Sequence, residues 1–305
     1  MSKLTVSVIV ASHNARETLA ECLNALENQQ GAPAFEVIVV DNSTDGSDEI
    51  VRRQFPQVQL VLAAPQSYIP ELWEIGINQS AGDIVALTTG HFIPRQDWVE
   101  AIRQAHTNPH AGIGGAIEND PHAGWVDWAI YFCRYTPYML PFLLATRHDI
   151  AGDNASYKRA ALEQCQEVRR NGFWEPVVHA DMHKCGLALL VSPEIVVTHR
   201  KSFALRAFLR QRFHHGRQFG SGRAATMPGA KRLLYIMASP LIPGVFLARI
   251  IPRVFLKRRH RLRLLLALPL MTLFLTSWAT GELCGYLGLS TASVQKRNPA
   301  LKGSA

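Results

Sequence analysis

The sequence has few cysteines and no cysteine pattern. Its five cysteines (Cys22, Cys133, Cys165, Cys185 and Cys284) are scattered along 305 residues, and none forms a Cys-x-x-Cys pair. This spacing argues against a disulfide framework and a structural zinc site, and it is typical of a reducing cytosol. A signal-peptide pattern is also missing, because the first apolar run is only six or seven residues long. We therefore expect the N-terminal half to stay in the compartment where it is synthesised.

Acidic residues are almost absent from the last third of the chain. Residues 200–305 contain 19 Lys and Arg and one acid, Glu282, whereas residues 1–199 contain 13 basic and 23 acidic residues. With 48% hydrophobic and 18% charged residues, the chain can bury a core and is not expected to be disordered. The charge difference predicts two domains: residues 1–202, resembling a soluble enzyme, and residues 203–305, a basic and apolar region that meets an anionic surface.

Strand-like and helix-like segments alternate in the N-terminal half. Continuous β-branched runs predict buried strands, and amphipathic stretches predict helices. The strands are expected at residues 6–11, 35–40, 58–62 and 84–87, and the helices from Asn14 (with Glu17 completing a capping box) and at 49–54, 70–79 and 97–105. This alternation is typical of an α/β fold with a parallel sheet between layers of helices.

Polar stretches follow three of the expected strands. They are Ser-His-Asn at 12–14, Asp-Asn-Ser at 41–43 and Thr-Thr-Gly-His at 88–91. In open α/β sheets ligands bind at the carboxyl ends of the strands. There Asp41 could accept a hydrogen bond from a ribose or a base, and the alternative is that it caps the following turn. Neither a Gly-x-Gly-x-x-Gly motif nor a P-loop follows the first strand, so dinucleotide-binding and P-loop enzymes are not expected.

Six segments, taken together, carry a family resemblance. They are VSVIVASHNARETLAECLNALENQ, FEVIVVDNSTDGSDEIV, AGDIVALTTGHFIPRQDW, GDNASYKRAAL, the segment around Glu175, and VVTHRKS, and they span about residues 5–202. In combination they resemble the family-2 glycosyltransferases, inverting enzymes of the glycosyltransferase-A fold. The resemblance implies an α/β domain with a mostly parallel central sheet flanked by helices, here followed by a hydrophobic and basic helical region.

The resemblance also implies which residues bind the donor. Ser12 and Asn14 would line the nucleotide pocket, and Asp41 would contact the base or the ribose. Further nucleotide-sugar contacts are expected from Thr89 and His91. Asn154, in the family's small-residue stretch near donor and acceptor, and Asp153 are weaker candidates.

The acidic pair Asp-x-Asp, with which the family holds a divalent cation on the donor diphosphate, is absent. The aligned residues are Thr88, Thr89 and Gly90, which offer no anionic oxygen ligand for Mg²⁺. Three explanations of the missing acidic pair remain. A Mn²⁺ or Mg²⁺ ion is held by other residues, basic side chains neutralise the diphosphate, or the chain does not catalyse transfer. His91 and His199 are the candidate ligands for such an ion, because imidazole suits Mn²⁺ better than Mg²⁺. For His91, an ordinary hydrogen-bonded position in the pocket is the alternative.

An inverting transfer needs a carboxylate that removes the proton of the acceptor hydroxyl. The family places this base at the start of a helix that ends at a glycine eleven residues later, and counting back from Gly186 reaches Glu175. Pro176 suits a first helical turn, where an acid also gains from the helix dipole. Asp181 is the alternative base, although an acid in the middle of a helix more often faces solvent.

Residues 118–148 are rich in aromatic side chains. Trp125, Trp128, Tyr131, Phe132, Tyr135 and Tyr138 could line an acceptor groove. The alternative is helix packing, since Trp125, Trp128 and Phe132 lie at spacings of three and four residues.

The C-terminal region combines basic and apolar stretches. Residues 233–256 and 264–289 are apolar, and basic residues flank them at 231–232, 257–263 and 296–297. If each stretch crossed a membrane once, the basic cluster at 257–263 would lie on the far side from the first domain, against the positive-inside rule. We therefore expect re-entrant or interfacial helices, and docking on the soluble domain is the alternative. The basic C-terminal region contains no nucleic-acid recognition motif, so nucleic acid is not an expected partner.

These observations predict an inverting glycosyltransferase that moves a sugar from a nucleotide sugar to a lipid-linked or membrane-proximal saccharide acceptor. We expect it at the cytoplasmic face of a membrane, the inner membrane if the chain is bacterial. The alternative is a non-catalytic nucleotide-sugar-binding or scaffold subunit of an envelope-polymer assembly. The missing acidic pair favours this alternative, whereas Asp41 and Glu175 argue against it.

Overall fold

The computed structural model describes residues 5–289. Within them the chain forms two compact units: residues 5–120 with 138–200, and residues 121–137 with 201–289. The division into domains after residue 202 stays a prediction, and it differs from the two compact units at residues 121–137 and 201–202. The basic pair at 296–297 lies outside the described residues.

The first unit contains a nine-stranded sheet. Its strands are β1 (Val6–Ser12), β2 (Phe35–Asp41), β3 (Gln59–Leu62), β4 (Ile84–Thr89), β5 (Phe92–Pro94), β6 (Gly112–Asn119), β7 (Ala145–Arg147), β8 (Ala155–Lys158) and β9 (Leu189–His199). The order is β3-β2-β1-β4-β8-β6-β9-β5, with β7 also paired to β9. The first four strands are parallel, as the sequence predicts. The second half adds antiparallel pairings through β8, β5 and β7.

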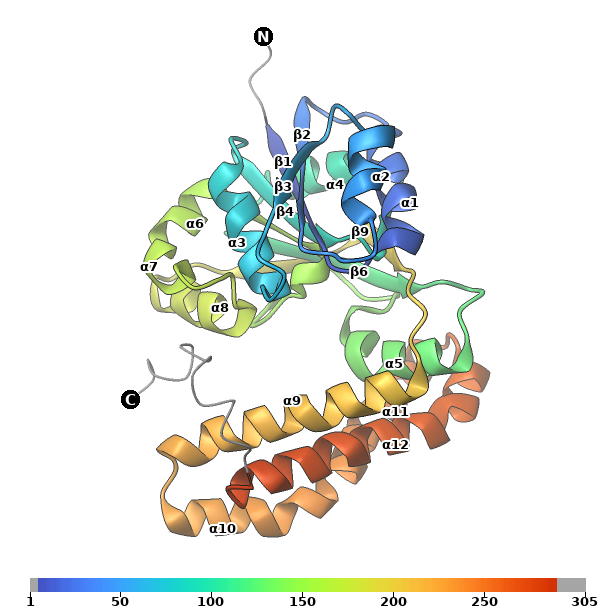
Figure 1. The fold of residues 1–305 in the computed structure, drawn as a ribbon, viewed down its shortest axis with the longest axis vertical. Helices are drawn as coiled ribbons and strands as arrows, with labels where there is room; N and C mark the ends of the chain where they lie inside the picture. The colour runs from blue at the N-terminus through green and yellow to red at the C-terminus, as the bar shows by residue number, and fades with distance from the viewer. Residues whose placement is uncertain (1–4, 290–305) are drawn as a thin grey trace. The chain divides into compact units, whose positions relative to one another are not determined.

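Helices cover both faces of this sheet (Figure 1). They are α1 (Arg16–Glu27), α2 (Ser47–Gln54), α3 (Ile69–Gln79), α4 (Trp98–Ala105), α6 (Arg159–Gln164), α7 (Gln166–Arg169), α8 (Glu175–Lys184) and the 3₁₀ turn η2 (Gly152–Asn154). On one face, Gln29 at the end of α1 accepts a hydrogen bond from the backbone N–H of Val99 in α4. On the other, a buried ion pair between Glu74 and Arg169, 2.6 Å long, joins α3 to α7.

The start of α1 differs from the sequence prediction. The helix begins at Arg16 with Ala15 as its N-cap, and no side chain caps it. Asn14 lies before the helix with a positive φ of 49°, so the expected capping box with Glu17 is wrong. Asn14 instead accepts a hydrogen bond from the backbone N–H of Thr44, because a short amide side chain tolerates the left-handed region and bonds locally.

One large cluster of the hydrophobic core joins the sheet to α3 and α8. Ile9 and Leu87 of the sheet meet Leu72 and Trp73 of α3 and Met182 of α8, and all five are at most 3% exposed. Burying a large apolar side chain contributes roughly 1.5–3 kcal/mol. This packing fixes α3 and α8 against the strands whose ends carry the candidate site.

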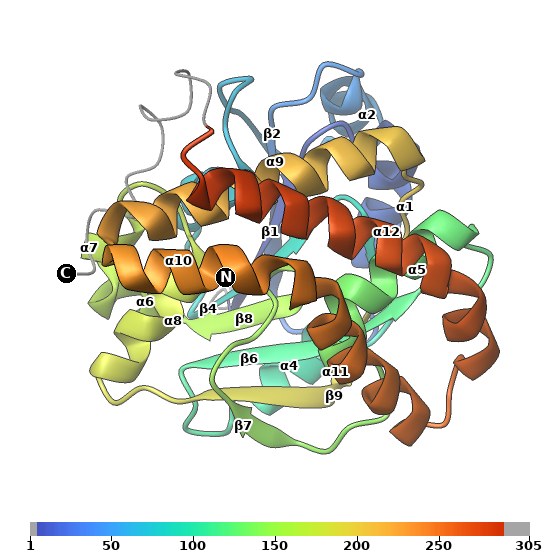
Figure 2. The same ribbon diagram turned by 90° about the horizontal axis from the view of Figure 1, so that it is seen from below.

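The second unit is helical in the part that the structure describes. It consists of α5 (Trp125–Tyr135), most of the 3₁₀ turn η1 (Thr136–Tyr138), α9 (Leu205–Thr226), α10 (Gly229–Ala238), η3 (Ser239–Leu241), α11 (Ile242–Leu256) and α12 (Arg261–Tyr286). Figures 1 and 2 show α12 alongside α9. Two stretches, Gly229–Leu256 and Arg261–Tyr286, are long and apolar enough to cross a membrane, a test that core helices of soluble proteins also pass.

Two Gly-x-x-x-Gly motifs bring α9 and α12 into close backbone contact. Gly216 and Gly220 of α9 face Gly281 and Gly285 of α12. A Cβ atom on Gly216 would lie 2.2 Å from the carbonyl oxygen of Trp278, and one on Gly281 would lie 2.0 Å from that of Phe213. The contacts advance in the same direction along both helices, so the pair is parallel. Small residues at this spacing permit such an approach.

The buried His106, which caps the C-terminal end of α4, predicts a pH dependence of stability. Burial first, and the charge of Lys158 second, lower its pKa from 6.5 to about 3, and its ring bonds to the hydroxyl of Ser156. The imidazole of His106 therefore binds a proton more readily in the unfolded chain than in the folded one. Its contribution to the free energy of unfolding is complete above pH 6.5 and falls by about 1.4 kcal/mol per pH unit as the pH drops towards 3. Thermal unfolding between pH 7 and 5 should therefore show a weaker pH dependence for His106→Gln than for the wild type. The exposed His122→Gln is the control, and equal slopes for all three proteins would contradict this account.

Candidate functional site

The carboxyl ends of β1 and β2 meet at Ser43. Ser12 and Asp41 are paired at the ends of the two parallel strands, and both are buried. The carboxylate of Asp41 accepts hydrogen bonds from the hydroxyl of Ser43 (2.6 Å) and from its backbone N–H (3.1 Å). The Ser43 hydroxyl lies 3.5 Å from that of Ser12 and accepts a bond from the backbone N–H of Asn14. The structure thus brings together Ser12, Asn14 and Asp41, and Asp41 makes the turn-capping contact that the sequence offered as the alternative.

The loops beside this cluster are held by side-chain amides. Asn42 donates hydrogen bonds to the carbonyl oxygens of Ala64 (3.4 Å) and Ser67 (2.7 Å) and pairs with the ring of His13 at 2.9 Å. These contacts tie the loop after β3 to the ends of β1 and β2.

The end of β4 carries the threonines that replace the acidic pair. Thr88 is fully buried, and its hydroxyl donates to the carbonyl oxygen of Asp153 (3.0 Å), while its own carbonyl accepts from the indole N–H of Trp73 (2.8 Å). Thr89 is 4% exposed, and its hydroxyl has no hydrogen-bond partner among the described residues. Gly90 fits tightly, because a Cβ atom there would lie 2.9 Å from Ala15.

The two candidate metal-ligating histidines do not form a metal site with acidic or other ligands. His91 lies 3.1 Å from the hydroxyl of Thr18, and His199 is 2% exposed, with its ring 3.4 Å from the amide oxygen of Asn119 and packed on Phe92. In residues 5–289 no group of three or more His, Cys, Asp or Glu side chains could hold a metal ion. Hydroxyls and single imidazoles are a poor donor set for Mg²⁺ or Mn²⁺. The residues present therefore do not fit the cation that the family holds with its acidic pair.

Glu175 is the first residue of α8, where the sequence predicts the start of a helix. One of its carboxylate oxygens, Oε1, accepts a 2.5 Å hydrogen bond from the backbone N–H of Gly152 in η2. A Cβ atom on Gly152 would lie 2.7 Å from that oxygen and 2.8 Å from the ring of Trp73, so only glycine allows this contact. Because Asp153 of the same turn holds Thr88, η2 links Glu175 to the end of β4.

One helical turn after Glu175, His179 anchors α8. Its side chain is fully buried and lies 2.8 Å from the hydroxyl of Tyr157 in β8 and 3.3 Å from the carboxylate of Asp149. Burial lowers the pKa of His179, opposed by Asp149. Asp181, the alternative base, lies on another face of α8; burial first and Asp181 second raise the pKa of the Cys165 thiol to about 11. The structure therefore places Glu175, and not Asp181, beside η2.

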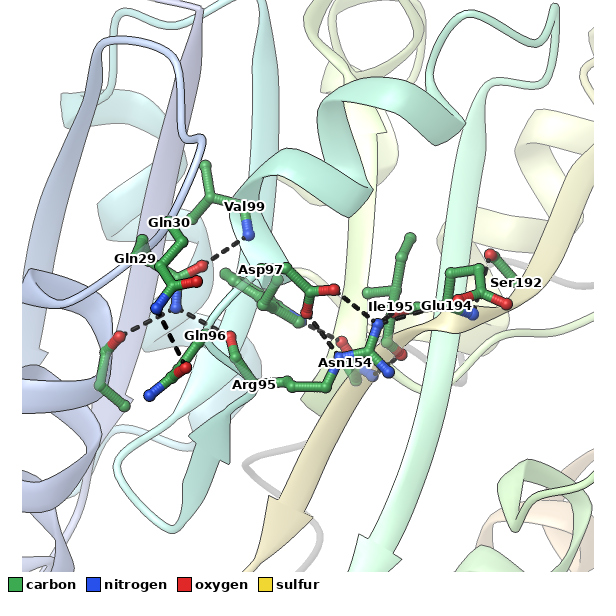
Figure 3. Close-up of polar contacts among 12 residues, drawn as sticks. Gln29, Gln30, Arg95, Gln96, Asp97, Val99, Asn154, Ser192, Glu194 and Ile195 are labelled. Carbon is green, nitrogen blue, oxygen red and sulfur yellow. Dashed lines mark hydrogen bonds and ion pairs between the residues drawn. The ribbon is translucent and has the colours of Figure 1, made fainter.

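Asn154 lies beneath the site and is fully buried. Its amide oxygen accepts from the indole N–H of Trp98 (2.8 Å), and its amide nitrogen donates to the carbonyl oxygens of Ala116 (2.8 Å) and Ile195 (3.0 Å). Figure 3 shows Asn154 beside Ile195, next to the contacts of Arg95 with Asp97 and Glu194. All the bonds of this amide are made within the protein, which favours a structural role over contact with the donor.

The aromatic segment is divided between the two units. Trp128, Tyr131, Phe132 and Tyr135 of α5 are buried within the second unit, where Trp128 packs against His260. This arrangement favours the packing interpretation for α5. Trp125, which the packing stripe included, is 53% exposed. Tyr138 belongs to the first unit, where burial first and the charge of Glu175 second raise its pKa.

Three residues that organise the candidate site received no role from the sequence: Ser43, Trp73 and Gly152. Ser43 stands in the polar turn after the second strand, so its position was a usable signal. Trp73 and Gly152 gave no such signal, because their roles depend on contacts between segments far apart in the chain.

Comparison with known proteins gives the family. A family model described as "Glycosyl transferase family 2" matches residues 7–166, which is more than half of the chain. The chain belongs to glycosyl transferase family 2. The family and the α/β fold expected from the sequence are thereby confirmed.

This family-2 chain is similar to a named glycosyltransferase and to proteins of known structure. Glycosyltransferase AglE of Haloferax volcanii is 35% identical over 121 residues, which span 37% of this chain and 39% of AglE. The mannosyltransferase PcManGT of Pyrobaculum calidifontis was solved with GDP-Man and Mn²⁺. It matches with a TM-score of 0.54 at 19% identity, and the match covers 93% of this chain and 88% of PcManGT. TarS of S. aureus, solved with UDP-GlcNAc, has a TM-score of 0.47 at 16% identity, covering 93% and 92%.

Replacing Asn154 in this family-2 chain distinguishes a structural from a donor-binding role. Asn154→Ala leaves the Trp98 N–H and two buried carbonyls without their partners, which should lower the free energy of unfolding by about 2–4 kcal/mol. Nucleotide affinity, measured by calorimetry well below the unfolding temperature, should stay unchanged. A variant that keeps its stability and loses affinity would return Asn154 to the donor site.

Proposed function

We propose that this chain is an inverting glycosyltransferase that moves a sugar from a nucleotide-sugar donor to a lipid-linked or membrane-proximal saccharide acceptor. The observation that carries the proposal is the contact between Glu175 and Gly152, through which η2 links a carboxylate to the end of β4. Family membership and the donors bound by the solved neighbours support a nucleotide sugar as the substrate class.

The nucleotide would lie over the carboxyl ends of β1 and β2. Ser12, Asn14 and Asp41 are together there, and Ser43 joins them by hydrogen bonds. Thr89 and His91, at the end of β4, would face the sugar diphosphate. The unpartnered hydroxyl of Thr89 could donate a hydrogen bond to a phosphate oxygen.

Glu175 would act as the general base. Its carboxylate removes the proton of the acceptor hydroxyl while that oxygen attacks the anomeric carbon, and the bond from this carbon to the donor diphosphate breaks. Attack on the side opposite the leaving group inverts the configuration. The Gly152 N–H fixes one carboxylate oxygen, and the buried His179 fixes the helix, so the base is oriented before substrate binds.

The second unit supports an acceptor held at a membrane. Two of its stretches, Gly229–Leu256 and Arg261–Tyr286, are long and apolar, and the chain from residue 200 onward carries 19 basic residues and one acid. Such a surface attracts the anionic lipids of a cytoplasmic leaflet. We therefore propose the cytoplasmic face of a membrane, the inner one in a bacterium, as the location.

A scaffold subunit that binds nucleotide sugars without turnover is the second candidate. The absence of the acidic pair favours it, because the described residues offer no replacement cation site. Turnover of the donor discriminates between the two candidates.

Replacement of Glu175 tests the catalytic proposal. Glu175→Gln keeps the size of the side chain and removes the base, so transfer should fall by about 10²–10⁴-fold while nucleotide affinity is kept. Transfer is measured with detergent-solubilised protein over a panel of nucleotide sugars and acceptors. Asp181→Asn, on another face of the same helix, is the matched control and should retain activity. Loss of activity in Asp181→Asn alone would reverse the assignment of the base.

Chelation tests the role of a cation. Because the described residues do not fit Mg²⁺ or Mn²⁺, we expect transfer to proceed at an unchanged rate in a chelator, and nucleotide affinity not to depend on added Mn²⁺. A loss of transfer in chelator that Mn²⁺ restores would show that a cation is held by other means.

A further inference from the structure

The exposed apolar surface of the second unit lies on the helices that pass the length test for crossing a membrane. Several large apolar side chains of α10, α11 and α12 are between 36% and 81% exposed, among them Leu234, Met237, Leu256, Leu262 and Leu273. We infer that α10, α11 and α12 lie in the plane of one anionic leaflet and that neither stretch crosses the bilayer. This inference rests on the proposed membrane location and specifies how the membrane is bound.

The packing of α12 on α9 is the first reason. The facing glycines place the backbones in contact, and the hydroxyl of Ser277 in α12 donates to the carbonyl oxygen of Leu209 in α9. The phenyl rings of Phe208 and Phe274 continue the contact towards the N-terminal ends of both helices. A helix held in this way cannot cross a bilayer unless its companion crosses with it.

The composition of α9 is the second reason. It contains five arginines (Arg206, Arg210, Arg212, Arg217 and Arg223) and two histidines, and Arg206 and Arg210 are exposed. Arginine is among the residues that a bilayer centre tolerates least. Helix α9 runs parallel to α12 and contacts it from Phe208 to Gly220. If α12 crossed the bilayer, the arginines of α9 would therefore lie in the hydrocarbon layer.

The stretch from α10 to α11 supplies the third reason. Basic residues stand at 231, 232, 249 and 253, so the uncharged part, residues 233–248, is only 16 residues long. About 20 apolar residues are needed to span the hydrocarbon layer. Helices with exposed apolar side chains and flanking basic residues bind instead at the interface, where the long basic side chains reach the head groups.

The turn between α11 and α12 offers a place for lipid phosphates. A shallow, open hollow of about 460 Å³ lies there, lined by Pro252, Phe255, Leu256, Arg258 and Arg261. Arg258 and Arg261 beside apolar side chains match a lipid phosphate with the first part of its acyl chain, and the guanidinium of Arg261 also donates to the carbonyl oxygen of Phe255. In a spanning hairpin this turn would lie on the opposite side of the membrane from the first unit.

Labelling of the turn tests the inference. Cys185, an exposed native cysteine of the first unit, reports the outward face of sealed membrane vesicles through reaction with a membrane-impermeant maleimide. Arg259→Cys is then placed in a Cys185→Ser background. We expect this cysteine to react equally before and after detergent is added. Reaction only after detergent would overturn the inference, because the turn would then lie inside the vesicles.

Flotation with vesicles of phosphatidylcholine and phosphatidylglycerol gives the second measurement. Met237→Glu, at a side chain 71% exposed, should weaken binding at least tenfold, and Arg258→Gln should weaken it about fivefold, the equivalent of about 1 kcal/mol. Leu143→Glu, at an 85% exposed side chain of the first unit, is the matched control and should bind as the wild type does. Equal binding by Met237→Glu and the control would overturn the inference. Both assays read membrane binding and not transfer, so their failure is distinct from a failure of the proposed activity.

Discussion

The geometry of the candidate site depends on a hydrogen bond between one backbone amide and one carboxylate. The N–H of Gly152 holds Glu175 at the first turn of α8, and the next residue of the same 3₁₀ turn holds the end of β4 through Thr88. A side chain at position 152 would collide with Trp73 and with Glu175 itself. Two further features hold these elements in position. The hydrophobic core packs α3 and α8 against the strands, and the buried His179 of α8 bonds to Tyr157 of β8.

Local patterns predicted the parallel half of the sheet well. The β-branched runs and amphipathic helices gave β1 to β4 and α2 to α4 within about two residues, because burial on both faces dictates those sequences. The antiparallel strands β5, β7 and β8 are only three or four residues long, and their pairing comes from contacts between distant segments. Periodicity within a short window cannot specify such pairings.

The candidate site was predictable as a place and less so as a set of roles. Strand ends mark the sheet edge, so the grouping of Ser12, Asn14 and Asp41 follows from topology. Whether a polar side chain can contact a ligand depends on how deeply it is buried. The sequence alone does not reveal the burial of a single polar residue. The resemblance predicts a ligand-binding amide at Asn154, and only the structure reveals the three hydrogen bonds that this amide makes within the protein. The same limit applies to the aromatic residues of α5, which pack within the second unit.

The grouping of residues 121–137 with the C-terminal helices bears on folding. Helix α5 contacts α12, and its Trp128 packs against His260 and Arg263, more than 130 residues later in the chain. During synthesis these aromatic side chains must therefore wait for the C-terminal helices before they are buried. Contacts of such long sequence separation slow folding and leave apolar surface open to aggregation or to chaperones. For the same reason the first unit cannot be released by a single cut: a chain ending at residue 200 would keep α5 without the helix that covers it.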